Sequence, residues 1–244
     1  LGNNEIISGY KEPIGHHGTF CLKEILKQKT AFDILDINIA NNYDEPQLNG
    51  IILGIKKAID EILWIWQKKS NKVSDLNSHI WDQWAGEDGT IGKAYGYQLA
   101  KKYEFKTKEG MQTLDQVDYM LYLLKHDPAS RRIMTNIFNH EELKDMRLEP
   151  CAYGTQWLVK EGKLHLILNQ RSQDMLAANG WNTMQYAALL RMVAQCVGLK
   201  PGTLTHNIGD CHIYDRHVPL IKKLIDAEPM DVTPKFVIKN DTKD

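Results

Sequence analysis

The stretch that decides the fold reads QWLVKEGKLHLIL and occupies residues 156–168. Apolar residues stand on both sides of Glu161-Gly162, a dipeptide that suits a tight turn. The pattern therefore predicts a β-hairpin whose second strand runs on into the polar sequence NQRS at 169–172. A polar cluster at the end of a strand is a common place for a functional site.

Helical patterns lie on both sides of this hairpin. Apolar residues recur at helical spacing over 51–70 and again over 114–124, and the second pattern is expected to stop before Asp127-Pro128. A third helix is predicted over 182–197, with Gly198 at its end. With a short alternating strand expected over 32–39, this order of helices and hairpins predicts an α+β fold.

Composition and charge narrow the class of protein. The 244 residues are 43% hydrophobic, and 30 basic side chains nearly balance 31 acidic ones, so neither bulk electrostatic binding of DNA nor that of RNA is expected. The longest apolar stretch, over 51–66, carries four charged residues and is too polar to span a membrane. The four cysteines stand apart without a C-x-x-C pair, so we expect no disulfide scaffold, no metal site and a reducing, cytoplasmic location.

Two upstream segments contain candidate site residues. Glu61 lies inside an apolar helical pattern, where it either points outward, as most glutamates do, or is held in an apolar cleft with the raised pKa that proton transfer requires. Trp81 and Trp84 precede a glycine-rich turn and either form a stacking wall for a planar ligand or belong to the core.

Two further motifs carry polar or nucleophilic groups. Arg131 and Arg132 are either a phosphate or carboxylate site, because guanidinium groups offer planar forks of donors, or a solvated basic pair. Cys151 stands at the start of a predicted strand. Beside several arginines its thiol would have a lowered pKa and could attack an electrophilic carbon, whereas a lone cysteine is more often a buried structural residue. Spacing alone leaves both alternatives open.

These motifs, taken together and in order, resemble the thymidylate synthase family. The likeness covers roughly residues 46–225 and rests on several independent segments. They are EILW at 61–64, HIWDQW at 79–84, GKAYG at 92–96, Arg132, PCAYGTQWLV at 150–159, QRSQDM at 170–175, Asn182 and GDCHIY at 209–214.

The resemblance implies a single domain over 1–244 with a central mixed sheet and packed helices. It also implies a homodimer that forms through the sheet and shares its active sites between subunits. Residues 1–45 would be a divergent N-terminal segment, and the expected location is the cytoplasm of a bacterium or of a phage-infected bacterium.

The chemistry that the resemblance implies is the transfer of a one-carbon unit from 5,10-methylenetetrahydrofolate to C5 of a pyrimidine nucleotide, here dUMP, without a metal. Cys151 would add to C6 of the ring, which makes C5 nucleophilic. Arg171 would sit near Cys151 and help it to ionise.

The resemblance also assigns the remaining site residues. Arg171 and Ser172 would hold the nucleotide phosphate with Arg131 and Arg132 of the other subunit. The amide of Asn182 would recognise uracil, since it offers both a donor and an acceptor. His212 and Tyr214 would contact the ribose, and Glu61 and Tyr95 would transfer protons. Trp81, Trp84 and Asp174 would bind the folate, and Asp174 would also be a catalytic residue.

Two departures from the family pattern affect the expected product. The family's Gly-x-Pro-Phe-Asn reads Ala178-Asn179-Gly180-Trp181-Asn182, so the loop that presents Asn182 has changed. The chain ends at Asp244, before the apolar tail that closes over the folate in a synthase, and segment 42–46 is similar to phage deoxycytidylate hydroxymethylases, which have Asp in place of Asn182.

An open site admits water to the exocyclic methylene intermediate, so a chain without this lid is expected to add hydroxide. We therefore expect a deoxyuridylate hydroxymethylase that makes 5-hydroxymethyl-dUMP. The alternatives are a thymidylate synthase that makes dTMP and dihydrofolate and, third, a catalytically silent relative that binds nucleotide or RNA.

Overall fold

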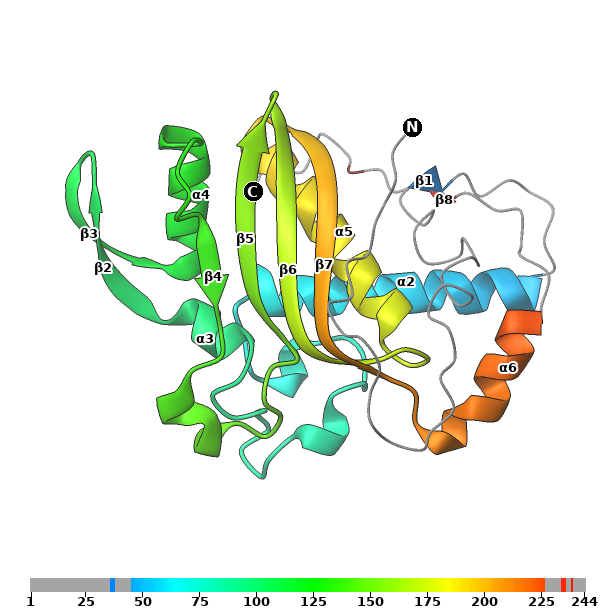
Figure 1. The fold of residues 1–244 in the computed structure, drawn as a ribbon. Coiled ribbons are helices and arrows are strands. Elements are labelled where there is room, and N and C mark those ends of the chain that lie inside the picture. The colour runs from blue at the N-terminus through cyan, green and yellow to red at the C-terminus, as the bar shows by residue number, and fades with distance from the viewer. Residues whose placement is uncertain (1–35, 38–44, 227–233, 236–237, 239–244) are drawn as a thin grey trace.

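A four-stranded mixed sheet is the centre of the computed structural model, which describes residues 36–37, 45–226, 234–235 and 238. The strands are β4 (Met134–Asn136), β5 (Ala152–Lys160), β6 (Lys163–Asp174) and β7 (Lys200–His212), in that spatial order. Helices α2 (Glu45–Trp66) and α5 (Asn179–Cys196) pack behind the sheet in Figure 1. This arrangement confirms the predicted α+β fold with a mixed sheet.

The predicted hairpin is confirmed as β5 and β6. The two strands pair antiparallel with Lys160 opposite Lys163, and both residues of the Glu161-Gly162 turn have positive φ angles of 51° and 70°. Such a turn matches the right-handed twist of the flanking strands. Both strands extend beyond the apolar stretch, because the polar residues on either side continue the ladder toward the site.

Strand β7 was not predicted from the sequence. It begins with Lys200-Pro201-Gly202, and its small and polar residues lack the apolar enrichment of β6. It pairs parallel with β6, and α5 supplies the crossover that a parallel connection requires. The β5–β6 pair is antiparallel and the β6–β7 pair is parallel, so the sheet is mixed.

The core lies between the sheet and the two long helices. Its largest fully buried side chains include Trp64 of α2, Trp157 of β5, and Leu164, Leu166 and Leu168, which lie on one face of β6. The alternation along β6 places every second residue toward the helices. The hairpin that decides the fold therefore supplies much of the core.

Helix boundaries agree with the predictions at the C-terminal ends more than at the N-terminal ends. Helix α5 stops before Gly198, which adopts a φ of 72° while Leu199 N donates to Ala194 O, as predicted from the glycine. Helix α2 begins at Glu45, earlier than predicted, with Pro46 in its first turn. Proline is tolerated there because its missing N–H has no acceptor in the helix.

The remaining elements surround the sheet. Helix α4 (Gln116–His126) ends before Asp127-Pro128 as predicted, but Leu114 belongs to a strand. Of the strand predicted over 32–39, only Asp36–Ile37 is described, and the other residues lie outside the described part. The other elements are β1 (Asp36–Ile37) paired with β8 (Pro234–Lys235), η3 (Val73–Asp75), η4 (Asp82–Trp84), α3 (Gly96–Ala100), β2 (Lys102–Thr107) paired with β3 (Gly110–Asp115), η5 (His140–Asp145), η6 (Asp215–His217) and α6 (Val218–Asp226).

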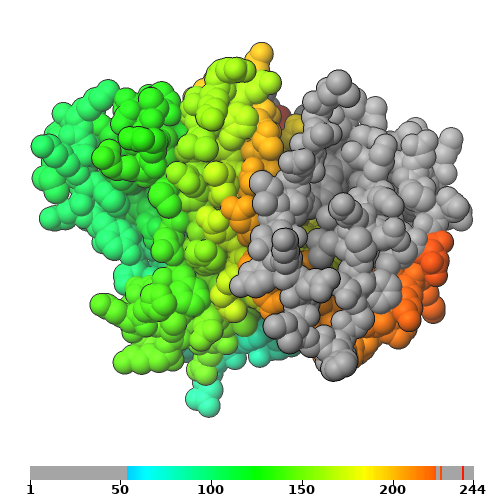
Figure 2. Space-filling view, viewed as in Figure 1, coloured from blue at the N-terminus to red at the C-terminus, as the bar shows by residue number. Residues whose placement is uncertain are grey.

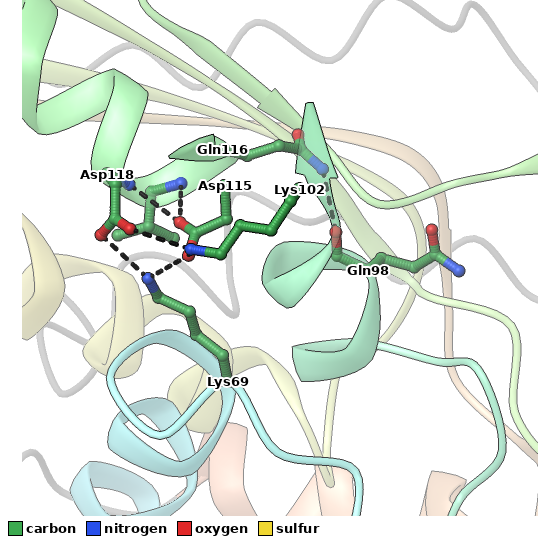
Figure 3. A network of polar contacts seen from close by, with 7 residues as sticks. Lys69, Gln98, Lys102, Asp115, Gln116 and Asp118 are labelled. Carbon is green, nitrogen blue, oxygen red and sulfur yellow. Dashed lines mark hydrogen bonds and ion pairs between the residues drawn. The ribbon is translucent and has the colours of Figure 1, made fainter. Parts of the chain in front are cut away.

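A polar network around Asp115 joins α4 to the end of α2 (Figure 3). One carboxylate oxygen accepts from the backbone N–H groups at the start of α4, and the other accepts from Lys69 Nζ at 2.7 Å and Lys102 Nζ at 2.8 Å. Asp118 pairs with the same two lysines. Burial disfavours the charged form of Asp115, but these hydrogen bonds hold its pKa at about 2.

We expect Asp115→Ala to lower the free energy of unfolding by about 2 kcal/mol, because it removes both a helix cap and a charge that two lysines share. Asp115→Asn, which keeps a cap acceptor, should lose less. Since the folded pKa is depressed, this stabilisation is present above the ordinary pKa of 3.8 and is lost as the pH falls toward about 2. Urea titrations of the three proteins at neutral and acid pH measure it, and equal stability at pH 7 would contradict the network's role.

Candidate functional site

The predicted site residues gather at one end of the sheet. Cys151 directly precedes β5, while Arg171 and Ser172 lie near the end of β6 and His212 ends β7. Because β5 runs antiparallel to β6 and β7 runs parallel to it, the start of one strand and the ends of the other two meet at the same edge. The topology therefore brings together segments far apart in the sequence (Figure 1).

Arg171 fixes the segment that carries Cys151. Its backbone N–H donates to Cys151 O at 2.9 Å, and its guanidinium donates to Pro150 O at 3.1 Å and to Glu149 O at 3.0 Å. The guanidinium thus holds the approach to the nucleophile through carbonyl groups.

The surroundings of Cys151 act on the pKa of its thiol in opposite directions. Burial raises the pKa of the thiol above its ordinary value, the charge of Arg171 opposes that rise, and Glu149 adds to it. Within one chain Arg171 is the only arginine that lowers this pKa among the described residues, and it does not offset burial. The partly buried Cys151 is a free thiol.

Tyr95 lies directly behind Cys151. Its hydroxyl accepts a hydrogen bond from Cys151 N at 3.3 Å, and the residue is only 8% exposed. Burial, and then the neighbouring Cys151, raise the pKa of the phenol well above its ordinary value, so the ring stays neutral. Tyr95 also has a φ of 46°, an unfavourable conformation for a tyrosine that the surrounding structure must hold in place.

Close backbone packing accounts for part of that constraint. A Cβ atom added to Gly96 would lie 2.2 Å from Ser70 O, so only glycine allows the chain to pass there. The residue next to Tyr95 is therefore packed directly against the backbone that follows α2.

Glu61 is buried, which decides between its two alternatives. The side chain is 7% exposed and accepts three hydrogen bonds, from Trp81 Nε1 at 2.6 Å, Trp181 Nε1 at 2.5 Å and Gln185 Nε2 at 2.5 Å. Burial raises the pKa of Glu61, and the three donors act in the opposite direction. A carboxyl group with a raised pKa in a buried site is suited to proton transfer.

Trp81 and Trp84 combine parts of both of their alternatives. Trp81 belongs to the buried core and lies 5.2 Å from the ring of Tyr95, centroid to centroid, while its indole N–H is committed to Glu61. Trp84 is half-buried against Trp81, with ring centroids 5.2 Å apart. Of the two, only Trp84 keeps exposed surface with which to contact a ligand.

Asn182 is connected to both Glu61 and the strand that carries Arg171. Asn182 Nδ2 donates to Gln185 Oε1 at 3.2 Å, and Gln185 in turn donates to Glu61. Gln170, the neighbour of Arg171, donates to Asn182 Oδ1 at 3.3 Å. These bonds complete a closed series of contacts, here called the site ring: Cys151, Tyr95, Trp81, Glu61, Gln185, Asn182, Gln170 and Arg171.

Sequence reasoning missed Gln170, Trp181 and Gln185 as members of this site. A usable signal was present for Gln185, because a polar side chain three residues after Asn182 lies on the same face of the helix. No local signal links Trp181 or Gln185 to Glu61, since 120 or more residues separate them along the chain.

Asp174, His212 and Tyr214 form a second group at the same edge. The Asp174 carboxylate accepts from Leu176 N at 3.0 Å, and its other oxygen lies 3.4 Å from His217 Nδ1. The rings of His212 and Tyr214 stand 5.0 Å apart, and Tyr214 is 47% exposed. His212 Nδ1 is buried and makes no hydrogen bond within the described chain, and Asp210 Oδ2 lies 3.7 Å from it.

Arg131 and Arg132 are not part of this arrangement. Both are exposed in the turn before β4, where Arg131 O accepts a hydrogen bond from Gln156 Nε2 at 3.4 Å. Gln156 is five residues along β5 from Cys151, which corresponds to about 16 Å at the usual rise of a strand. The structure of one chain alone therefore leaves the pair apart from Cys151.

The described ranges contain neither a metal-binding cluster nor a membrane-spanning helix. No group of three His, Cys, Asp or Glu side chains there is arranged to hold a metal ion. No helix in these ranges has both the length and the apolar character needed to cross a bilayer.

Comparison with known proteins gives a consistent result. A family model described as thymidylate synthase matches residues 37–244. Thymidylate synthase 1 of Bacillus amyloliquefaciens is 49% identical over 207 residues, which cover 84% of this chain and 88% of that protein. Thymidylate synthase of Bacillus atrophaeus is 50% identical over 202 residues, which cover 82% of this chain and 87% of that protein.

A solved structure agrees with the sequence matches. The thermostable thymidylate synthase A from Bacillus subtilis superposes with a TM-score of 0.68 at 51% identity, and the match covers 72% of this chain and 64% of that chain. Together with the family model, this similarity shows that the chain belongs to the thymidylate synthase family of one-carbon transferases, which use methylenetetrahydrofolate as co-substrate.

Proposed function

We propose that this protein is a thymidylate synthase, which converts dUMP and methylenetetrahydrofolate into dTMP and dihydrofolate. The observation that carries the proposal is the site ring, which joins the backbone of Cys151, a free thiol residue, to a buried carboxyl group and an amide suited to uracil. The relatives that share about half of the sequence are named thymidylate synthase, and they favour this alternative over the hydroxymethylase expected from the position of the C-terminus.

The site ring supplies the protein groups that the reaction needs at C5 and C6 of the uracil. The Cys151 sulfur adds to C6 and the electron pair of the 5,6 double bond moves toward C5 and O4, so C5 can bond to the folate methylene. The Asn182 amide is suited to O4 and N3–H of uracil. Its link through Gln185 places Glu61 within the same hydrogen-bonded series, where a carboxyl group can transfer protons at O4 and C5.

The nucleotide's other parts fit the remaining residues. The guanidinium of Arg171 and the hydroxyl of Ser172 are proposed to hold the phosphate, because a planar fork of donors suits its oxygens. His212 and the exposed Tyr214, whose rings stand 5.0 Å apart, are proposed to bind the ribose. Trp84 and Asp174 are proposed folate contacts, with Trp81 holding Trp84 in place through ring packing.

The product assay separates the two catalytic functions. Purified protein is incubated with labelled dUMP and methylenetetrahydrofolate, and the nucleotide and folate products are resolved chromatographically. A synthase yields dTMP with dihydrofolate, because the exocyclic methylene takes a hydride from the folate. Formation of 5-hydroxymethyl-dUMP with tetrahydrofolate would instead establish the hydroxymethylase, and no product would favour the silent relative.

We also propose that the active protein is a dimer built through the open face of the sheet. Helices α2 and α5 cover one face, while the other presents side chains of β5, β6 and β7, part of which is visible at the surface in Figure 2. Met134 of β4 is 52% exposed, and Leu158 and Ile167 on this face are only partly buried. A second copy would bury these apolar groups and could bring Arg131 and Arg132 to its partner's site.

Subunit complementation is expected if the sites are shared. Cys151→Ala and the double variant Arg131→Ala/Arg132→Ala should each be inactive, but mixed under conditions that exchange subunits they should recover about a quarter of wild-type activity, because random pairing completes one site in each hybrid dimer. The control is a mixture of Cys151→Ala with Glu61→Gln, which should recover no activity, because both residues belong to the same subunit's site. No recovery in the first mixture, with confirmed subunit exchange, would contradict the shared site.

A further inference from the structure

Trp181 occupies the place where the chain departs from the family pattern, directly before Asn182. It lies in the first turn of α5, and its indole Nε1 donates to Glu61 Oε2 at 2.5 Å. A phenylalanine at this position would have no N–H. Trp181 therefore gives the buried carboxyl group of Glu61 a donor that a hydrocarbon ring of similar kind would lack.

In each hydrogen bond to Glu61 the neighbouring side chain is the donor and the carboxylate is the acceptor. An indole N–H can only donate, so Trp81 and Trp181 require an oxygen with a free lone pair. Gln185 approaches with its Nε2, while its Oε1 is already occupied by Asn182. Trp181 and Gln185 share Oε2, whereas Trp81 alone contacts Oε1. All three partners thus stabilise the ionised form and define the rotation of the carboxyl plane.

The rest of the surroundings is uncharged. Across the described chain, the titratable groups that act on Glu61 from neighbouring elements are the phenols of Tyr95 and Tyr186, and burial raises the pKa of both above the neutral range. No lysine or arginine contacts the carboxylate among the hydrogen bonds and ion pairs of these residues. The three neutral donors are therefore what offsets burial of the charge.

We propose that Trp181 is a positioning residue of the reaction, whose indole N–H holds the Glu61 carboxyl group in place and keeps it ionisable. The proposal rests on the proposed function in so far as Glu61 transfers protons. Because Trp181 precedes Asn182 on α5, it also ties the orientation of Glu61 to the helix turn that presents the uracil-recognising amide. The turn that carries Trp181 and Asn182 thus also holds Glu61.

The test compares Trp181→Phe, which keeps an aromatic ring but removes the donor, with the wild type. Protein labelled with ¹³C at glutamate carboxyl carbons is titrated by NMR, and Glu61→Gln assigns the Glu61 signal. Loss of one hydrogen bond to a charged group should raise the Glu61 pKa by about one unit, a ten-fold change in proton affinity. The limb of the kcat–pH profile that reports Glu61 should move upward by the same amount, with little change in KM for dUMP.

Trp157→Phe is the matched control, since its indole donates to Thr155 Oγ1 at 2.9 Å in the sheet and does not contact Glu61. It should leave the Glu61 titration unchanged. An unchanged titration in folded Trp181→Phe, or an equal shift in the control, would overturn the inference. A shifted titration without a shifted kcat profile would support the contact and reject the proton-transfer role of Glu61 in the proposed function.

A second measurement needs no Trp181 variant. In ¹⁵N-indole spectra of the wild-type protein, two indole N–H signals should move with the Glu61 titration and become independent of that pH range in Glu61→Gln. If the only responding indole signal is the one that Trp81→Phe removes, Trp181 does not bind the carboxylate in solution and the inference fails. This readout decides the matter even where Trp181→Phe does not fold.

Discussion

Cys151→Ala should lose at least about a thousand-fold in turnover, because removing a nucleophile removes the covalent step on which the following chemistry depends. Cys151 is the free thiol of the site ring, with Arg171 holding the carbonyl groups around it. The loss should appear in kcat, measured from dihydrofolate formation with saturating dUMP and methylenetetrahydrofolate. A variant that folds and binds dUMP but keeps turnover would contradict a role for the thiol.

Cys196→Ala is the matched control, because Cys196 is also a free thiol but lies exposed at the end of α5. The variant should retain full activity, because Cys196 lies outside the site ring. Loss of activity in this variant would mean that the assay reports stability rather than chemistry.

The raised pKa of Cys151 gives this reaction a pH dependence. Burial favours the neutral thiol, so the fraction of reactive thiolate, and with it the rate of adduct formation, should rise as the pH increases through the thiol pKa. Arg171→Gln should raise that pKa further, because the guanidinium is the group that opposes burial. Alkylation rates measured against pH in both proteins test this order.

Glu61→Gln should lower kcat by about 10²- to 10⁴-fold, the usual contribution of a positioned acid or base. The amide has nearly the same shape, but its NH₂ group faces indole and amide donors that already occupy both carboxyl oxygens. It therefore loses proton transfer and also places donors against donors. Steady-state kinetics should show this effect mainly in kcat, with smaller changes in the Kd for dUMP.

Glu141→Gln provides the corresponding control at an exposed glutamate of η5. It should leave kcat unchanged. Wild-type turnover in Glu61→Gln would remove Glu61 from the mechanism, whereas equal losses in both variants would indicate a general effect of the substitution.

The fold could be predicted in outline because residues close together in the sequence specify its central hairpin. The turn residues Glu161 and Gly162 and the apolar residues on either side specify β5 and β6 without reference to the rest of the chain. The local sequence of β7 does not specify a strand in this way, since its stability comes from pairing with β6 and from packing against α5. The hairpin of β2 and β3 escaped prediction for a related reason, because its strands have mostly exposed side chains.

The residues of the candidate site could be predicted, but their burial and pKa values could not. The family motifs identified Cys151, Glu61 and Asn182, and the structure brings them into the site ring of hydrogen bonds and ring packing. The sequence could not show the burial of Glu61 or the pKa of Cys151, because both depend on what packs around the groups in three dimensions. Trp181 was noticed only as a departure from a pattern, and its bond to Glu61 emerged from the packing of α2 against α5.

The most direct test of the account is mass spectrometry of the protein after incubation with 5-fluoro-dUMP and methylenetetrahydrofolate. The fluorine at C5 blocks the later loss of a proton, so the sulfur, nucleotide and folate should remain joined after denaturation. We predict that the peptide containing Cys151 carries the mass of both molecules, and that Cys151→Ala carries neither. A wild-type protein with no adduct on that peptide would contradict covalent catalysis by Cys151.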